Sequence, residues 1–131
     1  MIVIDASAAI ELLLGTSRGK AFRARLTRRP EQLCAPHLLD VETAHVLRRY
    51  ERSGDLSAPR AEQALADLEA LPVTRYPHTL LLRRMWQLRA NLTGYDAAYV
   101  ALAESLDFTL VTCDNKLAST PGHRARIDLL D

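Results

Sequence analysis

Short apolar strands alternate with longer helical segments along this chain, and no other feature constrains its fold as strongly. Runs rich in β-branched and apolar residues predict strands over 2–4, 33–35, 73–76 and 108–112, with a further short strand near Ile127. Apolar residues at helical spacing predict helices over 6–14, 17–27, 37–52, 58–71, 79–91 and 95–106, separated by prolines and glycines. Strands that are apolar on both faces and separated by helices are typical of a parallel sheet covered on both sides. We therefore expect an α/β fold, a three-layer α/β/α sandwich with a central, mainly parallel sheet.

The size and charge of the chain narrow the possibilities further. Its 131 residues, 48% of them hydrophobic, suit one core, so we expect a single domain over residues 1–131. With 17 Lys+Arg against 16 Asp+Glu the formal net charge is +1, which excludes the uniform basic field of a histone-like protein. Any nucleic-acid affinity must come from the arginine clusters at 23–29, 48–52 and 83–89, although a single cluster of this kind is more often a solvated helix face.

The cysteines and the N-terminus indicate the compartment. Cys34 and Cys113 are far apart and form no C-x-x-C pair, so neither a zinc pattern nor a disulfide framework is indicated, and a reduced compartment fits best. The first residues reach Asp5 after three apolar positions and lack the basic region and long apolar run of a signal peptide. No segment approaches the length of a membrane span. We expect a cytoplasmic protein with no membrane partner.

Two aspartates follow apolar strands. Asp5 comes directly after the first strand, and Asp114 comes just after the strand at 108–112. In an open parallel sheet, ligands bind beyond the carboxyl ends of the strands, where consecutive helices leave to opposite faces. The structural alternative is a helix N-cap for Asp5 and a cap or Asx-turn for Asp114. Asp107 precedes a strand, lies at the opposite edge and is excluded, as are Asp55 and Asp67.

Two further acids lie on helices at the margin of an apolar stripe. Glu42 flanks the stripe of its helix, and its alternatives are a complement to the helix macrodipole or a pair with Arg49. Asp96 opens an almost wholly apolar helix, with Tyr99 and Val100 following at helical spacing on the same face. An early-turn aspartate has an ordinary structural use, but this helix is expected to be buried, which favours a cleft position for Asp96.

If these acids converge, their repulsion requires protons, bases or a metal ion. The candidate catalytic and metal-binding residues are Asp5, Glu42, Asp96 and Asp114. Oxygen ligands alone favour Mg²⁺ or Mn²⁺ over zinc, and magnesium is usually shared with substrate phosphate. Such an ion lowers the pKa of a bound water for attack on a phosphodiester. Ser7, Thr112 and Asn115 are candidates to hold water or orient the carboxylates, although each is also an ordinary turn former.

Competing site motifs are absent. The sequence has no phosphate-binding glycine loop, no dinucleotide fingerprint, no H-E-x-x-H and no G-x-S-x-G, and its four histidines are scattered. A phosphatase with Asp5 as covalent nucleophile would need an aspartate two residues on, where Ser7 stands. Two alternatives to an RNA-cleaving enzyme stay open: a catalytically silent nucleic-acid or partner-binding module, and a metal-dependent nuclease or phosphatase with a non-RNA substrate.

The motifs around the four acids, in their order along the chain, resemble PIN-domain proteins, and in particular the VapC toxins of toxin–antitoxin pairs. The motifs are Ile2-Val3-Ile4-Asp5-Ala6-Ser7, Leu39-Asp40-Val41-Glu42, Tyr95-Asp96-Ala97-Ala98-Tyr99 and Thr112-Cys113-Asp114. The resemblance spans essentially the whole chain. It implies an α/β/α sandwich, a Mg²⁺- or Mn²⁺-dependent endoribonuclease, an RNA substrate and a cognate VapB-like antitoxin that occludes the site.

The resemblance also implies how the chain assembles and where it departs from its relatives. Family members often form homodimers, for which Leu82, Met85 and Trp86 are candidates, with plain core packing as the alternative. The candidate antitoxin surface, with the same alternative, is Leu12, Leu13, Phe22 and Leu26. Many relatives carry a further acid just after the last motif, where this chain has Asn115 and Lys116. One fewer negative charge weakens a second metal site, so we expect one firmly held ion and one recruited with RNA.

Overall fold

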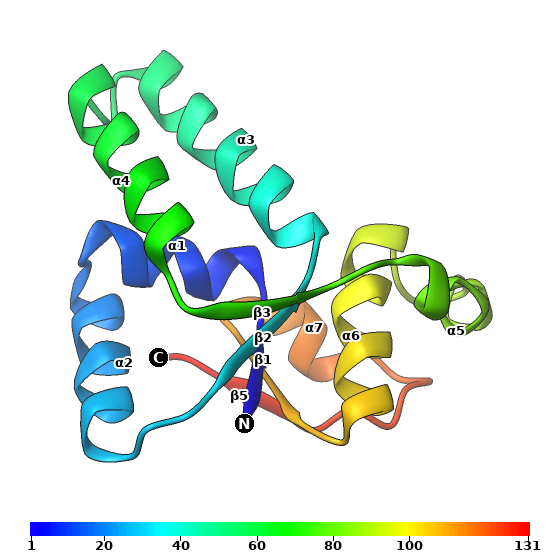
Figure 1. The fold of residues 1–131 in the computed structure, drawn as a ribbon. Coiled ribbons are helices and arrows are strands. Elements are labelled where there is room, and N and C mark those ends of the chain that lie inside the picture. The colour runs from blue at the N-terminus through cyan, green and yellow to red at the C-terminus, as the bar shows by residue number, and fades with distance from the viewer.

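The computed structural model describes all residues from Met1 to Asp131 and contains one five-stranded, fully parallel sheet (Figure 1). The strands are β1 (Ile2–Ile4), β2 (Leu33–Pro36), β3 (Val73–Tyr76), β4 (Thr109–Thr112) and β5 (Ile127–Leu129), in the spatial order β3-β2-β1-β4-β5. β1 and β2 are buried along their whole length, and β4 is buried except at its first residue. β3 and β5 are the half-exposed edges. Burial on both faces explains why the central strands are almost continuously apolar.

Helices cover both faces of the sheet. The helices are α1 (Ala6–Leu14), α2 (Ser17–Arg28), α3 (Leu38–Ser53), α4 (Ala58–Ala70), the 3₁₀ turn η1 (Thr79–Leu81), α5 (Leu82–Gln87), α6 (Gly94–Leu106) and α7 (Asn115–Ser119). In Figure 1, α1 and α2 lie on one face and α5, α6 and α7 on the other. The expected three-layer α/β/α sandwich is therefore confirmed, and the sheet is parallel throughout.

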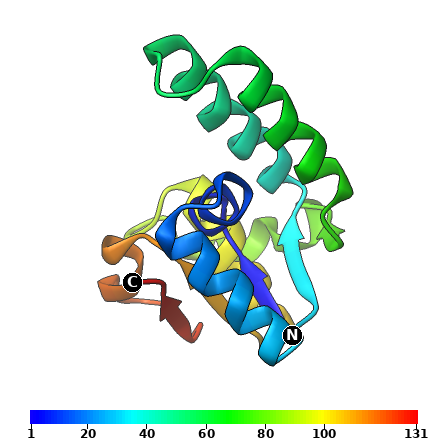
Figure 2. The same cartoon turned by 90° about the vertical axis from the view of Figure 1, so that its left-hand side faces the viewer.

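The pair α3 and α4 projects beyond the sheet as a helical hairpin, which Figure 2 shows rising above α1. A small cluster of buried residues joins the hairpin to α1, with Ile10 and Leu13 from α1 packing against Leu47, Ala64 and Leu68. The main core lies between the sheet and the helices, and it includes α6, whose residues from Ala97 to Ala103 are all buried. These two clusters fix the positions of α3 and α6 relative to the strand ends.

One predicted helix is interrupted in the structure, and one short helix was not predicted. The predicted helix over 79–91 is a 3₁₀ turn followed by the short α5, and residues 88–93 are turn and irregular backbone in which Leu88 and Leu92 are buried. The short α7, which Asp114 caps, was not predicted because five residues give too little periodicity. The apolar residues proposed for an antitoxin surface are mainly core: Leu12, Leu13 and Phe22 are buried and Leu26 packs against the core. None of the helices is both long and apolar enough to span a membrane.

Candidate active site at the switch point of the sheet

The sheet reverses its winding between β1 and β4. The chain leaves β1 into α1 on one face and leaves β4 into α7 on the other, so the carboxyl ends of these two neighbouring strands form a topological switch point. Asp5 is the N-cap of α1 and Asp114 is the N-cap of α7. Both capping alternatives raised from the sequence are therefore correct, and the two caps also lie at the place where such sheets bind ligands.

Hydroxyl groups and backbone amides hold Asp5 in a fixed orientation. Its Oδ1 accepts hydrogen bonds from Ser7 Oγ at 2.6 Å and from the Ala8 amide at 3.0 Å, while its Oδ2 accepts one from Thr112 Oγ1. The two hydroxyls in turn accept backbone N–H groups, Ser7 from Cys113 at 2.9 Å and Thr112 from Asp114 at 3.0 Å. Each hydroxyl proton is thus committed to Asp5, and the network joins the end of β1 to the end of β4.

Burial dominates the electrostatics of Asp5. Only 7% of the residue is exposed, and this burial raises the pKa of its carboxyl, whereas the hydrogen bonds from Ser7, Thr112 and Ala8 lower it. The nearby charge of Asp114 raises it again, and the net pKa lies above the ordinary value. Three hydrogen bonds occupy three of the roughly four acceptor positions of a carboxylate, which leaves room for one further partner.

Asp96 stands in the first turn of α6. Its amide donates to the N-cap Thr93 at 3.2 Å, but no protein group donates a hydrogen bond to its half-buried carboxylate. Burial raises the pKa of Asp96 first, and the negative charges of Asp114, Asp5 and Glu42 raise it further. These three charges have the same sign as that of Asp96, so the four acids lie near enough to one another to repel.

Glu42 approaches the site from α3 and is held by a residue that sequence reasoning missed. The hydroxyl of Tyr99, which is 1% exposed, donates to Glu42 Oε1 at 2.7 Å. Burial and the hydrogen bond to Glu42 both raise the pKa of Tyr99, which therefore stays a donor. Asp96 and Tyr99 lie three residues apart on one face of α6, and this spacing is the only sequence signal of the pairing.

The first turn of α3 has an unusual cap. His37 precedes the helix with no capping hydrogen bond of its own, and the Leu38 amide donates instead to Nε2 of His78 at 2.9 Å. His78 follows β3, so the loop after one edge strand fixes the start of the helix that carries Glu42.

Basic partners are missing from this cluster. Elsewhere the structure pairs acids with arginine: Glu104 with Arg84, Asp40 with Arg75, Asp107 with Arg126 and Asp128 with Arg25. None of the four acids at the switch point forms an ion pair, including Glu42, for which Arg49 was the alternative from sequence. The negative charge accumulated here is therefore uncompensated by the protein.

The donors suit a hard divalent cation, because all four are carboxylates. No three His, Cys, Asp or Glu side chains are arranged as a finished ligand group, and Asp5, Glu42 and Asp114 each accept at least one hydrogen bond from the protein. A cation at this site would thus complete its coordination with water or with substrate oxygens, as magnesium commonly does. Asn115, proposed to orient the carboxylates, is exposed at the start of α7, and its side chain forms no hydrogen bond with them.

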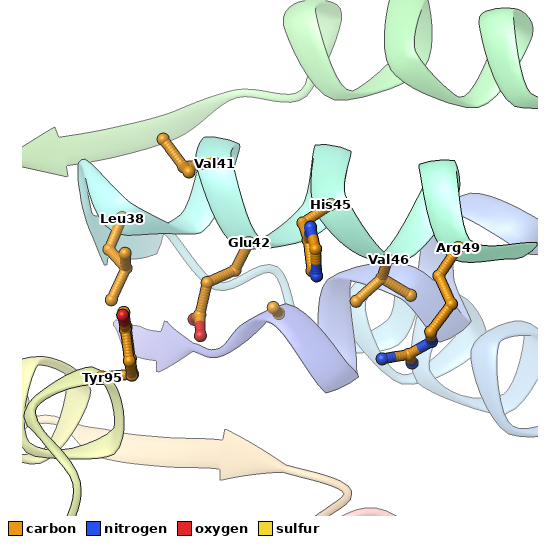
Figure 3. A pocket seen from close by; sticks show the side chains of 8 residues that line it. Leu38, Val41, Glu42, His45, Val46, Arg49 and Tyr95 are labelled. Carbon is orange, nitrogen blue, oxygen red and sulfur yellow. The ribbon is translucent and has the colours of Figure 1, made fainter.

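A groove of about 530 Å³ adjoins the acids (Figure 3). One face of α3 forms its long wall, and Ala6 and Tyr95 contribute from the starts of α1 and α6. Glu42 lies in this wall with its carboxylate directed toward β1, as Figure 3 shows. The groove residues are Ala6, Leu38, Val41, Glu42, His45, Val46, Arg49 and Tyr95.

The PIN domain family model matches residues 2–122, and the chain belongs to this family. Within it, the chain is 46% identical to the VapC ribonuclease Mb0985 of Mycobacterium bovis over 120 residues, which cover 92% of this chain and 91% of that protein. It is 45% identical to ribonuclease VapC1 of Mycobacterium tuberculosis over 132 residues, covering 98% and 96% of the two chains. The resemblance to VapC ribonucleases predicted from sequence is confirmed.

Solved structures agree on the fold. The crystal structure of PAE2754 from Pyrobaculum aerophilum superimposes with a TM-score of 0.71 and 28% identity, covering 98% of this chain and 83% of that one. A toxin–antitoxin complex from Klebsiella pneumoniae contains a chain with a TM-score of 0.65 and 20% identity, with 91% of each chain covered.

Proposed function

We propose that residues 1–131 form a single PIN-like domain that acts as the endoribonuclease toxin of a toxin–antitoxin pair and depends on Mg²⁺ or Mn²⁺. The observation that carries this proposal is the set of Asp5, Glu42, Asp96 and Asp114 at one switch point without a basic partner. Identity above 40% to named VapC ribonucleases over nine tenths of the chain supports the activity. VapC-type nucleases generally depend on a divalent metal ion.

The proposed roles follow from what each side chain contacts. Asp5, Asp96 and Asp114 would hold the ion, with Glu42 acting directly or through water. When bound, Mg²⁺ or Mn²⁺ would supply the positive charge that activates water and neutralises phosphate. Ser7 and Thr112 keep both oxygens of Asp5 oriented and ionised by donating to them. Tyr99, on α6, orients the carboxylate of Glu42, on α3, by donating a hydrogen bond to it.

The missing acid at Asn115 bears on how many ions are held. Asn115 is exposed and lies beside Asp114 at the start of α7, where a carboxylate would add negative charge to the cluster. Without it, we propose one firmly held ion, with a second recruited only when RNA phosphate contributes ligands.

A protein partner and a second copy are also part of the proposal. A structural neighbour was solved as a toxin–antitoxin complex, which supports a VapB-like antitoxin as partner. For the homodimer, the surface of η1 and α5 is the candidate, because Leu80 is 87% exposed, Leu82 54% and Trp86 68%. Met85, the third candidate from sequence, is only partly exposed and packs against the core.

The decisive experiment compares the wild-type chain with Asp5→Asn on three substrates: single-stranded RNA, single-stranded DNA and a small phosphodiester. Asparagine caps helices as well as aspartate does, so α1 is expected to remain intact in the variant. We expect cleavage of RNA alone, dependent on Mg²⁺ or Mn²⁺, and at least about a hundredfold loss in Asp5→Asn. Cleavage of DNA or of the small ester in preference to RNA would assign a different nuclease or phosphatase activity. RNA binding without cleavage and without divalent-ion binding by calorimetry would favour the silent module.

A further inference from the structure

The groove beside the acids has two chemically different ends. At one end, next to the start of α6, Tyr95 is 63% exposed although it is aromatic and stands directly before Asp96. At the other end, Arg49 is an exposed cation whose guanidinium lies 5.6 Å from the centre of the Tyr50 ring and forms no ion pair. Glu42 lies between these two ends on α3 (Figure 3).

The spacing of the α3 residues makes this arrangement continuous. Leu38, Glu42, Val46 and Arg49 recur at helical intervals of four, four and three residues, so they share one face of the helix. From Leu38 to Arg49 the helix rises by roughly 16 Å, which gives the groove the length to hold more than one nucleotide. Its volume of about 530 Å³ lies within the range of about 300–1,000 Å³ usual for sites that bind ligands.

We propose that this groove holds the single-stranded RNA on either side of the bond that is cut, with a base stacked on Tyr95 and a backbone phosphate contacting Arg49. The inference rests on the proposed ribonuclease function, because it uses Glu42 as the point where the strand passes the acids. An exposed aromatic ring stacks any base through its π-face, and a guanidinium binds phosphate through paired N–H donors. The apolar side chains of Leu38 and Val46 would cover the sugar and base edges between them.

Charge supports RNA over other occupants. A phosphodiester strand has a negative group at each step, and it needs a cation both at the acids and beside them. The bound divalent ion would supply the first, and Arg49 supplies the second on the same face of α3. Arg48, its neighbour in sequence, lies on a different side of the helix and lines a hollow with Ala61 and Leu65 of α4, so it is a matched control.

The test measures binding and cleavage separately. Binding of a fluorescein-labelled, ten-nucleotide single-stranded RNA is followed by anisotropy with Ca²⁺ in place of Mn²⁺ over a range of salt concentrations, and cleavage of the same RNA is followed with Mn²⁺. We expect Tyr95→Ala to weaken binding by about 5- to 100-fold and to raise KM in parallel, whereas Tyr95→Phe stays within about twofold. We expect Arg49→Ala to lower the slope of log K against log salt by about 0.7, whereas Arg48→Ala leaves that slope unchanged.

The outcomes separate this inference from the proposed function. If the wild-type chain cleaves no RNA with either ion, the proposed function fails, and the binding data alone then decide whether the groove takes RNA. If the wild-type chain cleaves RNA but Tyr95→Ala and Arg49→Ala bind and cleave normally, the inference is overturned and the function stands. Equal losses of RNA affinity in Arg48→Ala and Arg49→Ala would mean that RNA responds to the general positive charge of the helix and not to a contact in the groove, which would overturn the inference. Unchanged RNA binding with lost binding of a VapB-like antitoxin would assign the groove to the peptide instead.

Discussion

Two acidic residues of α6, Glu104 and Asp96, have opposite electrostatic surroundings. On α6, Glu104 has a side chain that is only 4% exposed, yet Arg84 donates to both of its oxygens at 2.7 and 3.0 Å, and the Arg124 amide adds a third bond. Burial raises the pKa of Glu104, but the hydrogen bonds and charges of Arg84 and Arg124 lower it by more. The net pKa therefore lies below the ordinary value. Eight residues earlier, in the first turn of the same helix, the carboxylate of Asp96 accepts no hydrogen bond and has a raised pKa. The fold supplies partners for the carboxylate of Glu104 and none for that of Asp96, which is the condition that the proposed cation site requires.

This contrast separates an acid whose ion pair stabilises the fold from acids that have no basic partner. The same helix carries both, so helix position and propensity do not explain the difference. What differs is the surroundings: Glu104 faces basic residues of α5 and of the segment before β5, while Asp96 faces three other carboxylates. A protein that keeps such a cluster sacrifices stability for a site, as strained and charged active sites commonly do.

The largest expected effect comes from removing the charge of Asp96. We expect Asp96→Asn to lower metal-dependent RNA cleavage at least about a hundredfold and, at neutral pH, to raise the melting temperature of the metal-free protein, because a repelled charge is gone. Gel assays and thermal unfolding measure the two effects. Asp107→Asn is the matched control, since Asp107 lies at the opposite edge in a left-handed conformation (φ 56°) that asparagine tolerates. Normal cleavage by Asp96→Asn would remove this residue from the site.

The companion variant is Glu104→Ala, for which we expect the opposite result: stability falls and RNA cleavage is unchanged. Removing this carboxylate leaves the Arg84 guanidinium and the Arg124 amide without their acceptor, so we expect unfolding to become easier by about 2–3 kcal/mol. Urea titration measures the loss. Below the temperature of unfolding, RNA cleavage should be unchanged, and a loss of activity in the folded variant would contradict the separation of the two groups.

Adding the cation should raise stability where the fold leaves charge unpaired. With Mn²⁺ at about one hundred times its Kd, ligand linkage predicts about 2.7 kcal/mol of added stability for the wild-type chain. The same addition should have much less effect on Asp96→Asn and its full effect on Asp107→Asn. A melting temperature that does not respond to Mn²⁺ or Mg²⁺ in the wild-type chain would argue against a metal site here.

Tyr99→Phe tests the support of the fourth acid. Loss of the hydroxyl removes the 2.7 Å hydrogen bond that orients Glu42, while the ring keeps its place in the core. We expect a stability loss of about 1 kcal/mol and roughly a tenfold increase in the Mn²⁺ concentration needed for half-maximal cleavage. If only stability changes, Tyr99 is a core residue with no part in positioning Glu42.

The smallest effect is a difference in pH dependence. Asp5 and Asp96 have raised pKa values, so their contribution favours the folded state below the ordinary aspartate pKa of 3.8 and is lost as pH rises through the raised values. Glu104 has a lowered pKa, so its contribution is present above 4.5 and is lost as pH falls through the folded value. From pH 4 to pH 7, metal-free Asp96→Asn should therefore gain more stability than the wild-type chain, by urea titration at both pH values.

The sequence predicted most of the fold because strand and helix periods are local signals. The helices at α1, α2, α3, α4 and α6 were predicted to within one residue at each end, and the alternation of strands with helices predicted the parallel sheet. The interruption after α5 was missed because Leu88 and Leu92 keep helical spacing although the chain turns there. Only tertiary packing distinguishes a continuous helix from a turn that has the same spacing of apolar residues.

At the site, the residues themselves were predictable and their partners were not. Asp5 and Asp114 follow strands, which places them at one edge of any parallel sheet. The hydrogen bond between Tyr99 and Glu42 joins residues 57 positions apart, and the capping of α3 by His78 joins residues 40 positions apart. Contacts of this kind depend on how α3 and α6 pack, and no local pattern encodes them. The metal-binding roles of the four acids stay a prediction.

The position of β1 in the middle of the sheet has a consequence for synthesis. Ile2 pairs with Leu33 on one side but with Thr109 on the other, so one of the two neighbours of the first strand lies near the end of the chain. Such long-range pairing is slow to form and cannot begin before the later strand has left the ribosome. A nascent chain therefore carries Asp5 and Glu42 early but cannot assemble the acidic cluster until β4 docks. The acidic cluster is therefore among the last parts of the fold to form.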